Sequence, residues 1–265
     1  MKPDKLSIHE IFEKQRRYVV PLYQRSYVWT QEDQWEPLWE DVVRQAEHCL
    51  SDPHGQVQKT HFLGAVVLNV NTIVGRGLPK SEVIDGQQRL TTFQILIAAL
   101  RDYANTKDDD VGSDFERLTE NPVRGDGSNE IFKVWPTNSD RASFAKVMSA
   151  TNPAAVRTAF GGGDGPLARM AEAYLYFYGA VETFVGETGD DEERASRLYA
   201  LYQALRVGLQ VIVIELEASD DPQVIFETLN ARGQPLLPSD LIRNYVFLQA
   251  STRGGPGFLT GLLPL

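Results

Sequence analysis

Apolar positions along the chain follow two periods, and the shorter one predicts strands. Runs rich in β-branched and aromatic residues occur at 16–23, 61–70, 81–84 and 210–216. Such runs, bounded by turn-forming residues, are typical of half-buried or buried strands. The segment 71–80 predicts a hairpin-like connection between the second and third of them. The pattern therefore predicts a small mixed sheet.

Helical spacing predicts the rest of the ordered chain. Ser7 and Glu10 form a capping box that begins a short helix ending near residue 15. Thr30 is placed to cap a second helix, with Pro37 in its first turns. The apolar stripe of that helix consists of Trp35, Leu38, Trp39, Val42, Val43, Ala46 and Leu50.

Five further helices are expected. The helix expected at 90–105 has an apolar stripe (Phe93, Ile95, Leu96, Ala99 and Leu100) and a polar end. Others are expected at 167–185 and 192–207. Asp221 and Pro222 have the residue types of an N-cap and a first helical position, and Ser239 or Asp240 caps a last helix to about 250.

Two breaks divide this pattern. Residues 106–130, with three consecutive aspartates and several Gly and Asn, predict an exposed loop, and 161–166 predicts a second break. We therefore expect an α+β fold whose core spans 1–105, with a mainly helical insertion at 106–208. The last core strand and C-terminal helices follow at 209–265.

Composition narrows the class of protein. The single cysteine excludes a disulfide scaffold and a cysteine-based metal cage within this sequence. No apolar run approaches the ~20 residues of a membrane span, and the N-terminus lacks the apolar core of a secretory signal. A cytoplasmic protein without a membrane partner is expected. The net charge of −10 disfavours DNA coating by bulk attraction, but residues 1–100 are nearly neutral and leave room for a local basic groove.

Several catalytic signatures are missing from the sequence. It contains no P-loop, no Gly-x-Ser-x-Gly elbow and no His-Glu-x-x-His pair. All four histidines lie within the first 61 residues, which disfavours a histidine-metal nuclease motif in this chain.

The segment Asp85-Gly86-Gln87-Gln88-Arg89 is the first candidate site, because it lies where a strand is expected to turn into a helix. Helix N-termini present unpaired N–H groups that favour phosphate, and Gly86 allows close approach of a ligand. Arg89 can clamp phosphate oxygens, the amides of Gln87 and Gln88 can donate to oxygens or read a base, and Asp85 can hold Mg²⁺ or orient a water. The alternative is an ordinary capped helix with polar surface side chains.

A second candidate is the aromatic segment 21–29. Arg25 supplies charge, Gln24 hydrogen bonds, and Tyr23, Tyr27 and Trp29 a stacking surface, the mixture found where a base or DNA backbone is bound. A packed aromatic turn with a structural arginine explains the same residues. His61, taken alone, is expected to be structural, and the segment 226–233 to be a helix end with its glycine stop.

Taken in order, these segments resemble one family. They are Tyr23-Gln24-Arg25 with its aromatic helix start, Phe62-Leu63-Gly64, Ile84 to Thr91, and Phe226 to Ile242. The set is similar to the N-terminal domain of the GmrSD/SspE family of modification-dependent type IV restriction proteins. The resemblance covers about residues 6–250 and implies a ParB/sulfiredoxin-like core. It also implies that this core is a GTPase-like nucleoside triphosphatase that has no P-loop and uses Mg²⁺.

The resemblance also implies roles for individual residues. Asp85, Gln87, Gln88 and Arg89 would be catalytic, and Asp85 would hold the metal. The nucleotide-binding set would be Gly86, Gln24, Arg25, Asn230 and Arg232. DNA or its modification would be sensed by Tyr23, Gln24, Arg25, Tyr27, Trp29 and His61.

Members of this family carry an HNH-type nuclease domain after this module, so the chain is expected to be the N-terminal part of a longer protein, or to act with a partner nuclease. The expected partners are a nucleoside triphosphate and modified double-stranded DNA, with homo-oligomerisation left open. The aromatic residues around Arg25 favour phosphorothioate-modified DNA. A sensor of glucosylated or hydroxymethylated cytosine, a DNA-binding module without hydrolysis, and an intrinsic nuclease or phosphotransferase are the alternatives.

Overall fold

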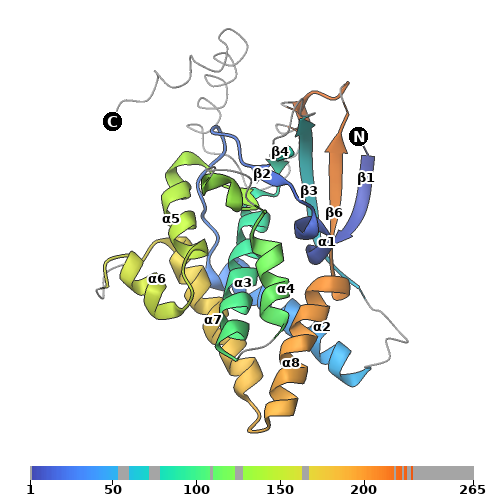
Figure 1. Ribbon diagram of the computed structural model, residues 1–265. Coiled ribbons are helices and arrows are strands. Elements are labelled where there is room, and N and C mark those ends of the chain that lie inside the picture. Colours follow the sequence, from blue (N-terminus) through green and yellow to red (C-terminus); the bar gives the residue numbers. More distant parts are fainter. Residues whose placement is uncertain are drawn as a thin grey trace.

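The structure is a computed structural model, drawn in Figure 1. It describes residues 2–52, 60–71, 78–107, 110–122, 128–162 and 167–217, and positions 219–222, 224, 225 and 228. Within these residues, helices fill the lower and left parts of Figure 1, and the long strands stand side by side at upper right.

The described strands form one six-stranded mixed sheet in the order β1-β6-β3-β4-β2-β5. Their bounds are β1 Lys2–Ser7, β2 Arg17–Val19, β3 His61–Asn71, β4 Lys80–Asp85, β5 Val134–Trp135 and β6 Leu209–Leu216. β6 pairs antiparallel with β1 and parallel with β3, while β3 and β4 are antiparallel. β2 runs parallel to both β4 and β5. The mixed sheet and the mixed class of fold are thus confirmed.

Two strands were not expected from the sequence. β1 carries Pro3 and charged residues and is largely exposed, and β5 has only two residues, so neither shows a periodic pattern. Both lie at the edges of the sheet, where one neighbouring strand supplies all the pairing. Their strand conformation therefore depends on β6 and β2 rather than on local sequence.

The cap predicted at Ser7 begins a helix as expected, whereas Thr30 precedes a π-helical turn and makes no side-chain cap bond. The described helices are α1 Ile8–Glu13, α2 Glu36–Ser51, α3 Gln87–Thr106, α4 Val111–Thr119, α5 Asn138–Met148, α6 Pro153–Ala159, α7 Arg169–Gly186 and α8 Asp191–Gln203. Both bonds of the Ser7–Glu10 capping box are present at the start of α1. A π-helical turn, Gln31–Trp35, precedes α2, and another, Ala204–Gly208, joins α8 to β6. Asp221 begins a helical turn, since its carbonyl accepts the N–H of Ile225.

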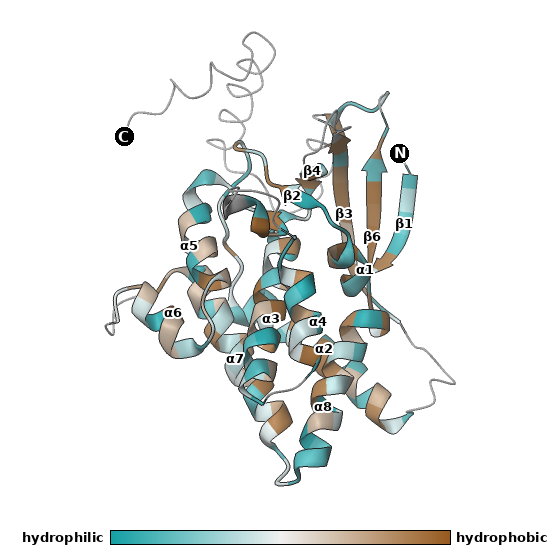
Figure 2. Ribbon diagram, viewed as in Figure 1, coloured by the Kyte–Doolittle hydropathy of each residue, from teal (hydrophilic) through white to brown (hydrophobic). Residues whose placement is uncertain are grey.

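The environment of α3 differs from the expectation of an amphipathic helix with a polar end. Its residues are buried almost without interruption from Gln88 to Ala104. Figures 1 and 2 show α3 in the middle of the helical body, with brown and teal positions alternating around it. Polar positions such as Arg101 and Asp102 are buried because neighbouring helices provide their partners: Arg101 Nε donates to Asp102, and Tyr174 of α7 donates to the same carboxylate at 2.6 Å.

The prediction of an exposed loop over 106–130 was wrong for its middle. Residues 111–119 form α4, and Phe115 and Leu118 of this helix are buried against α3. The neighbouring aspartates and glycines dominate the composition, but the apolar residues of α4 recur at helical spacing and are covered on folding. Ser128–Ile131, near the end of the segment, is a short 3-10 turn.

One continuous hydrophobic cluster joins the sheet to the helices, and it includes buried residues from both sides of position 105. A second, small cluster of Val67, Ile84 and Leu216 lies apart from it and packs against Tyr23 and Ile225. The division at 105 and 208 stays a prediction. Among the described helices, none combines the length and apolar character that a membrane crossing requires.

Candidate functional site

The turn between β4 and α3 is built around Gly86. This residue has φ 91° and occupies the N-cap position, where it offers no side-chain cap. A Cβ on Gly86 would lie 2.8 Å from Val66 Cγ2 and 3.2 Å from the Ala65 carbonyl oxygen. Glycine is therefore required at this position for two reasons: the backbone has a positive φ, and β3 approaches too closely for a side chain.

Arg89 completes the edge of β3. β4 ends opposite Val67, so the carbonyl of Ala65 has no strand partner on that side, and Arg89 Nη1 donates to it at 2.6 Å. Gly64, at φ 101° in an irregularity of β3, makes room for this contact, because a Cβ there would lie 2.8 Å from Arg89 Nη2. Burial lowers the pKa of Arg89 and the charge of Asp85 raises it, but guanidinium remains protonated in proteins.

The side chain of Gln24 likewise pairs with main-chain carbonyls at the edge of β4. The pairing of β2 with β4 stops at Val19, and the buried Nε2 of Gln24 donates to the next two carbonyls, those of Val83 at 2.6 Å and Ile84 at 2.9 Å. A strand edge that would otherwise bury unpaired acceptors is thus satisfied by a side chain. Gln24 has no amide hydrogen left for a nucleotide or DNA in this arrangement.

Gln87 and Gln88 fasten the Tyr23–Trp29 segment to α3. Gln87 Nε2 donates to the carbonyl of Arg25 at 3.0 Å and Gln88 Nε2 to that of Ser26 at 2.9 Å, while Gln88 Oε1 accepts from the N–H of Val28. The two sequence motifs are therefore one structural unit. Their amides contact main chain, and a catalytic role for them stays a prediction.

Tyr27 anchors the same segment in the core. Its hydroxyl bonds Thr92 of α3 at 2.7 Å and accepts from Trp35 Nε1 at 2.8 Å, and burial raises its pKa. Burial also raises the pKa of Tyr23, which packs against the small Val67 cluster. Of the predicted sensing tyrosines, Tyr27 is thus buried, with 7 % of its surface exposed.

Arg25, Asp85 and the first turn of α3 retain unpaired polar groups. Among the described residues, the side chains of Arg25 and Asp85 make no hydrogen bond or ion pair, and both are partly exposed. The N–H groups of Gln87 to Arg89 also lack partners in this part of the chain, since the first helical bond runs from Leu90 to Gly86. Because the Arg25 carbonyl accepts from Gln87, the main chain of Arg25 lies at the same end of α3 as Asp85.

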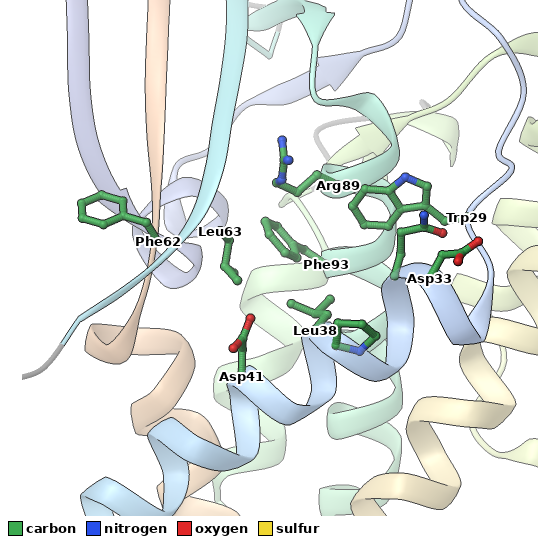
Figure 3. Close-up of a pocket in the computed structure, with 10 residues that line it drawn as sticks. Trp29, Asp33, Leu38, Asp41, Phe62, Leu63, Arg89 and Phe93 are labelled. Carbon is green, nitrogen blue, oxygen red and sulfur yellow. The ribbon is translucent and has the colours of Figure 1, made fainter. Parts of the chain in front are cut away.

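A hollow of about 240 Å³ lies beside this turn, between the start of β3, α2 and α3. Figure 3 shows the rings of Trp29 and Phe93 and the side chain of Leu38 around it, with Arg89 at the top and Asp41 below. Its lining residues are Trp29, Asp33, Gln34, Pro37, Leu38, Asp41, Phe62, Leu63, Arg89 and Phe93. Only Trp29 and Arg89 of these belong to the predicted site.

His61 lies next to this hollow rather than within its lining. Its Nε2 is 3.0 Å from Asp41 Oδ2, and the other oxygen of Asp41 accepts from Arg44 Nη1 at 2.7 Å. The lining residues that the sequence missed have one detectable signal, because Asp33, Pro37 and Asp41 are four residues apart and would share a helix face.

The remaining predicted residues can be placed only in part. Asn230 and Arg232, expected to close the nucleotide pocket, lie outside the described residues, as does the segment 239–250. In the described part of the chain no group of three or more His, Cys, Asp and Glu could hold a metal. A single accessible carboxylate such as Asp85 still suits Mg²⁺, which commonly binds through one or two carboxylates together with substrate phosphates.

Comparison with known proteins identifies one family. The model of the GmrSD restriction endonuclease N-terminal domain matches residues 8–247, which is most of the chain. A search of curated proteins finds no match.

Proposed function

The chain belongs to the GmrSD restriction endonuclease N-terminal domain family, and from this premise we propose that it binds and hydrolyses a nucleoside triphosphate to regulate modification-dependent DNA cleavage. The cleavage itself would come from a nuclease domain or partner. The proposal includes the predicted preference for phosphorothioate-modified DNA and the ParB/sulfiredoxin-like character of the core.

One observation carries the nucleotide part of this proposal. Groups without partners in the described chain are complementary to a polyphosphate: the N–H groups at the start of α3, the carboxylate of Asp85, and the guanidinium of Arg25, whose main chain is bonded to Gln87. The first turn of α3 contains no acidic residue that would repel an anion. Helix N-termini with such groups bind phosphate through directed N–H donors and the helix dipole.

Each group has a distinct task in this arrangement. The N–H groups of Gln87 and Gln88 hold phosphate oxygens, and Gly86 permits the approach that a side chain would block. Arg25 stabilises negative charge that develops on the transferred phosphoryl group. Arg89, through its bond to the Ala65 carbonyl, fixes the position of the turn and adds positive charge beside it.

Mg²⁺, when bound with the nucleotide, would neutralise charge on the phosphates. Asp85 is the residue that would hold it, since it is the carboxylate at the end of β4 without an ion-pair partner among the described residues. The same carboxylate can alternatively orient the attacking water, as the sequence predicts.

The DNA part of the proposal rests on the neighbouring surface. Arg25 and Trp29 are partly exposed and belong to the segment that Gln87 and Gln88 fasten to α3. Contact of DNA with this segment would therefore act directly on the first turn of the helix. Two ligands that favour the same arrangement of one segment raise each other's affinity.

Phosphate release tests the proposal. We would measure it for GTP, ATP, UTP and CTP with Mg²⁺, alone and with unmodified or phosphorothioate-bearing duplexes. Asp85→Asn and Arg25→Ala should each lower the rate by about 100-fold, the scale on which loss of one charge-stabilising group reduces catalysis. Modified duplex should raise the rate of the wild-type protein.

Asp191→Asn and Arg157→Ala are the matched controls. Asp191 is almost fully exposed on α8 and Arg157 is exposed on α6, so neither change should affect phosphate release. If folded wild-type protein releases no phosphate from any nucleotide, or if Asp85→Asn behaves as Asp191→Asn does, the catalytic assignment is wrong.

A DNA-binding module without hydrolysis is the second candidate. It is favoured by the engagement of Gln24, Gln87, Gln88 and Arg89 with main-chain carbonyls, which explains these side chains without chemistry. This candidate predicts affinity for modified duplex with no phosphate release. The measurements above therefore separate the two.

A further inference from the structure

The hollow between β3, α2 and α3 is not used by the proposed phosphate site, although Arg89 contributes to both. The main-chain N–H of Arg89 belongs to the first turn of α3, and its side chain lines the hollow. A ligand in the hollow would therefore lie beside the nucleotide phosphates without competing for the same donors. We propose that the hollow binds a single nucleobase that carries both carbonyl and amino groups, with guanine the best match.

The size of the hollow fits one ring system. About 240 Å³ is below the roughly 300–1,000 Å³ of pockets that enclose drug-sized ligands. A whole nucleotide does not fit such a volume, whereas its base does. The hollow is open to solvent, so the sugar and phosphates can remain outside it.

Aromatic and aliphatic side chains supply the flat surfaces. Trp29 is half-buried, Phe93 is buried, and Leu38 and Leu63 complete the apolar wall. In Figure 3 the rings of Trp29 and Phe93 both border the same space, and they come from different elements. Stacking on such rings is the usual way in which proteins hold an unpaired base.

The lining offers both hydrogen-bond donors and acceptors, which suits a base better than a simple ion. The donors are N–H groups of Arg89 and Gln34. Arg89 uses one N–H on Ala65 and makes no ion pair within the described chain, so its remaining N–H groups can donate to a carbonyl or ring nitrogen. Gln34 uses only its oxygen, accepting from Thr30, and so has an unused amide donor. Arginine pairs well with the O6 and N7 acceptors of guanine.

The carboxylates of Asp33 and Asp41 provide hydrogen-bond acceptors on the same lining. Asp33 accepts from Thr30 through Oδ2, which leaves Oδ1 without a partner among the described residues. Asp41 is held in place by His61 and Arg44, at 3.0 and 2.7 Å. A carboxylate accepts from amino groups, and guanine presents two adjacent N–H donors to it. A cation would be repelled by Arg89 and an anion by the aspartates, whereas a neutral base with both kinds of group is satisfied.

The base can come from two sources, the bound nucleotide or a nucleotide turned out of DNA. The first source deepens the proposed function and rests on it, and the second requires only DNA binding. The shared chemistry is the nucleobase, and the experiment distinguishes the sources.

Binding of free nucleosides tests the site without any catalysis. Guanosine, cytidine, adenosine and uridine would be titrated by calorimetry into the wild-type protein and into Asp33→Asn, Trp29→Leu and Trp29→Phe. Guanosine should bind most tightly. Trp29→Leu should weaken it by about tenfold, the size expected for loss of one stacking ring. Trp29→Phe should restore most of the affinity, and Asp191→Asn should leave it unchanged.

Two further titrations identify the source. If the base belongs to the nucleotide, Asp33→Asn and Trp29→Leu weaken GTP binding, while inorganic tripolyphosphate binds all variants equally. If it belongs to DNA, GTP binding is unchanged in both variants. A duplex with 2-aminopurine next to a guanine, whose fluorescence rises with the wild-type protein when that guanine leaves the stack, then shows no rise with either variant. Either result supports the site.

Two results would overturn the inference. One is that no nucleoside binds and neither GTP nor duplex binding responds to Trp29→Leu in folded protein. The other is that Trp29→Phe is as damaging as Trp29→Leu, since a stacking role requires only a ring. Because Asp85→Asn leaves this hollow intact, loss of phosphate release in that variant with normal nucleoside binding separates failure of the one proposal from failure of the other.

Discussion

Individual side chains of the two motifs finish the edges of strands. Gln24 donates to the carbonyls of Val83 and Ile84, and Arg89 donates to that of Ala65. In each case the neighbouring strand has ended, so that no strand pairs with the acceptor on that side. An unpaired buried carbonyl costs about 1–3 kcal/mol, so each of these bonds has a structural value independent of any ligand. The groups left over, Arg25 and Asp85, are the ones on which binding chemistry depends.

Gly64 provides a prediction at this scale. Gly64→Ala places a Cβ 2.8 Å from Arg89 Nη2 at a backbone conformation that L-residues rarely adopt. We expect the free energy of unfolding to fall by about 2 kcal/mol or more, measured by urea unfolding, because conformational strain is added to displacement of Arg89.

Gly161→Ala is the control for strain alone. Gly161 has nearly the same φ, 103°, but its Cβ would meet nothing within 4 Å. Its cost should be about 1 kcal/mol. Equal losses for the two variants would mean that the Gly64–Arg89 contact contributes nothing.

Among the elements, α3 packs most extensively against α4 and α7, and its buried polar side chains bond to residues of the neighbouring helices. Arg101 Nη2 donates to the carbonyls of Met148 and Ala150 at the end of α5, both at 3.1 Å, and Nη1 donates to Thr119 at the end of α4. These bonds allow a charged residue to lie in the helical core, since each of the three guanidinium nitrogens has an acceptor. The C-terminal half of α3 is therefore held in place by residues that follow it at the ends of α4 and α5.

Lys133 joins two other elements and leads to a pH prediction. It precedes β5, is 1 % exposed, and its Nζ donates to the carbonyl of Lys14 after α1 at 3.0 Å. Burial lowers its pKa from 10.5 to about 8, although the charge of Glu13 opposes this. Below pH 8 both folded and unfolded chains hold the proton, and the folded state carries the full cost of the buried charge.

Between pH 8 and 10.5 the unfolded chain retains a proton that the folded chain releases, so the wild-type protein gains stability there as pH rises. Lys133→Met removes this dependence. Its stability relative to wild type should fall by up to roughly 3 kcal/mol between pH 7 and 10.5. Urea unfolding at several pH values measures this, with exposed Lys146→Met as control. If the difference in unfolding free energy between Lys133→Met and the wild-type protein does not vary with pH, burial of the Lys133 charge does not destabilise the folded state.

For the whole molecule, charge decides how DNA can bind. A net charge of −10 opposes association, so any attraction must be local. Arg25 is a partly exposed cation next to the α3 turn, and its side chain has no hydrogen-bond or ion-pair partner among the described residues. If a duplex contacts this turn, Arg25→Ala should reduce the slope of log affinity against log salt by about 1.

Arg157→Ala should leave that slope unchanged, because Arg157 is exposed on α6, away from the turn. Binding isotherms at several salt concentrations distinguish the two variants. An unchanged slope for Arg25→Ala would place the DNA contact elsewhere on the molecule.

Local signals predicted much of the fold and located the candidate site. The Ser7 capping box, the amphipathic stripe of α2 and the strands β3, β4 and β6 are short-range patterns. They were predictable because caps and burial periods depend on neighbouring residues. The edge strands, α4 and the lining of the hollow were not, because they depend on contacts between distant segments.

The sequence by itself determined the capped start of α1, the strands β3, β4 and β6, the segment that forms the β4–α3 turn, and the family to which the chain belongs. Only the tertiary structure decided that Gln24, Gln87, Gln88 and Arg89 bond main chain while Arg25 and Asp85 stay without such partners among the described residues. The physical reason is that a sequence specifies which side chains can donate or accept. Which strand edge remains unpaired beside each of them is set by contacts between distant parts of the chain, such as Gln24 and Ile84, which are 60 positions apart.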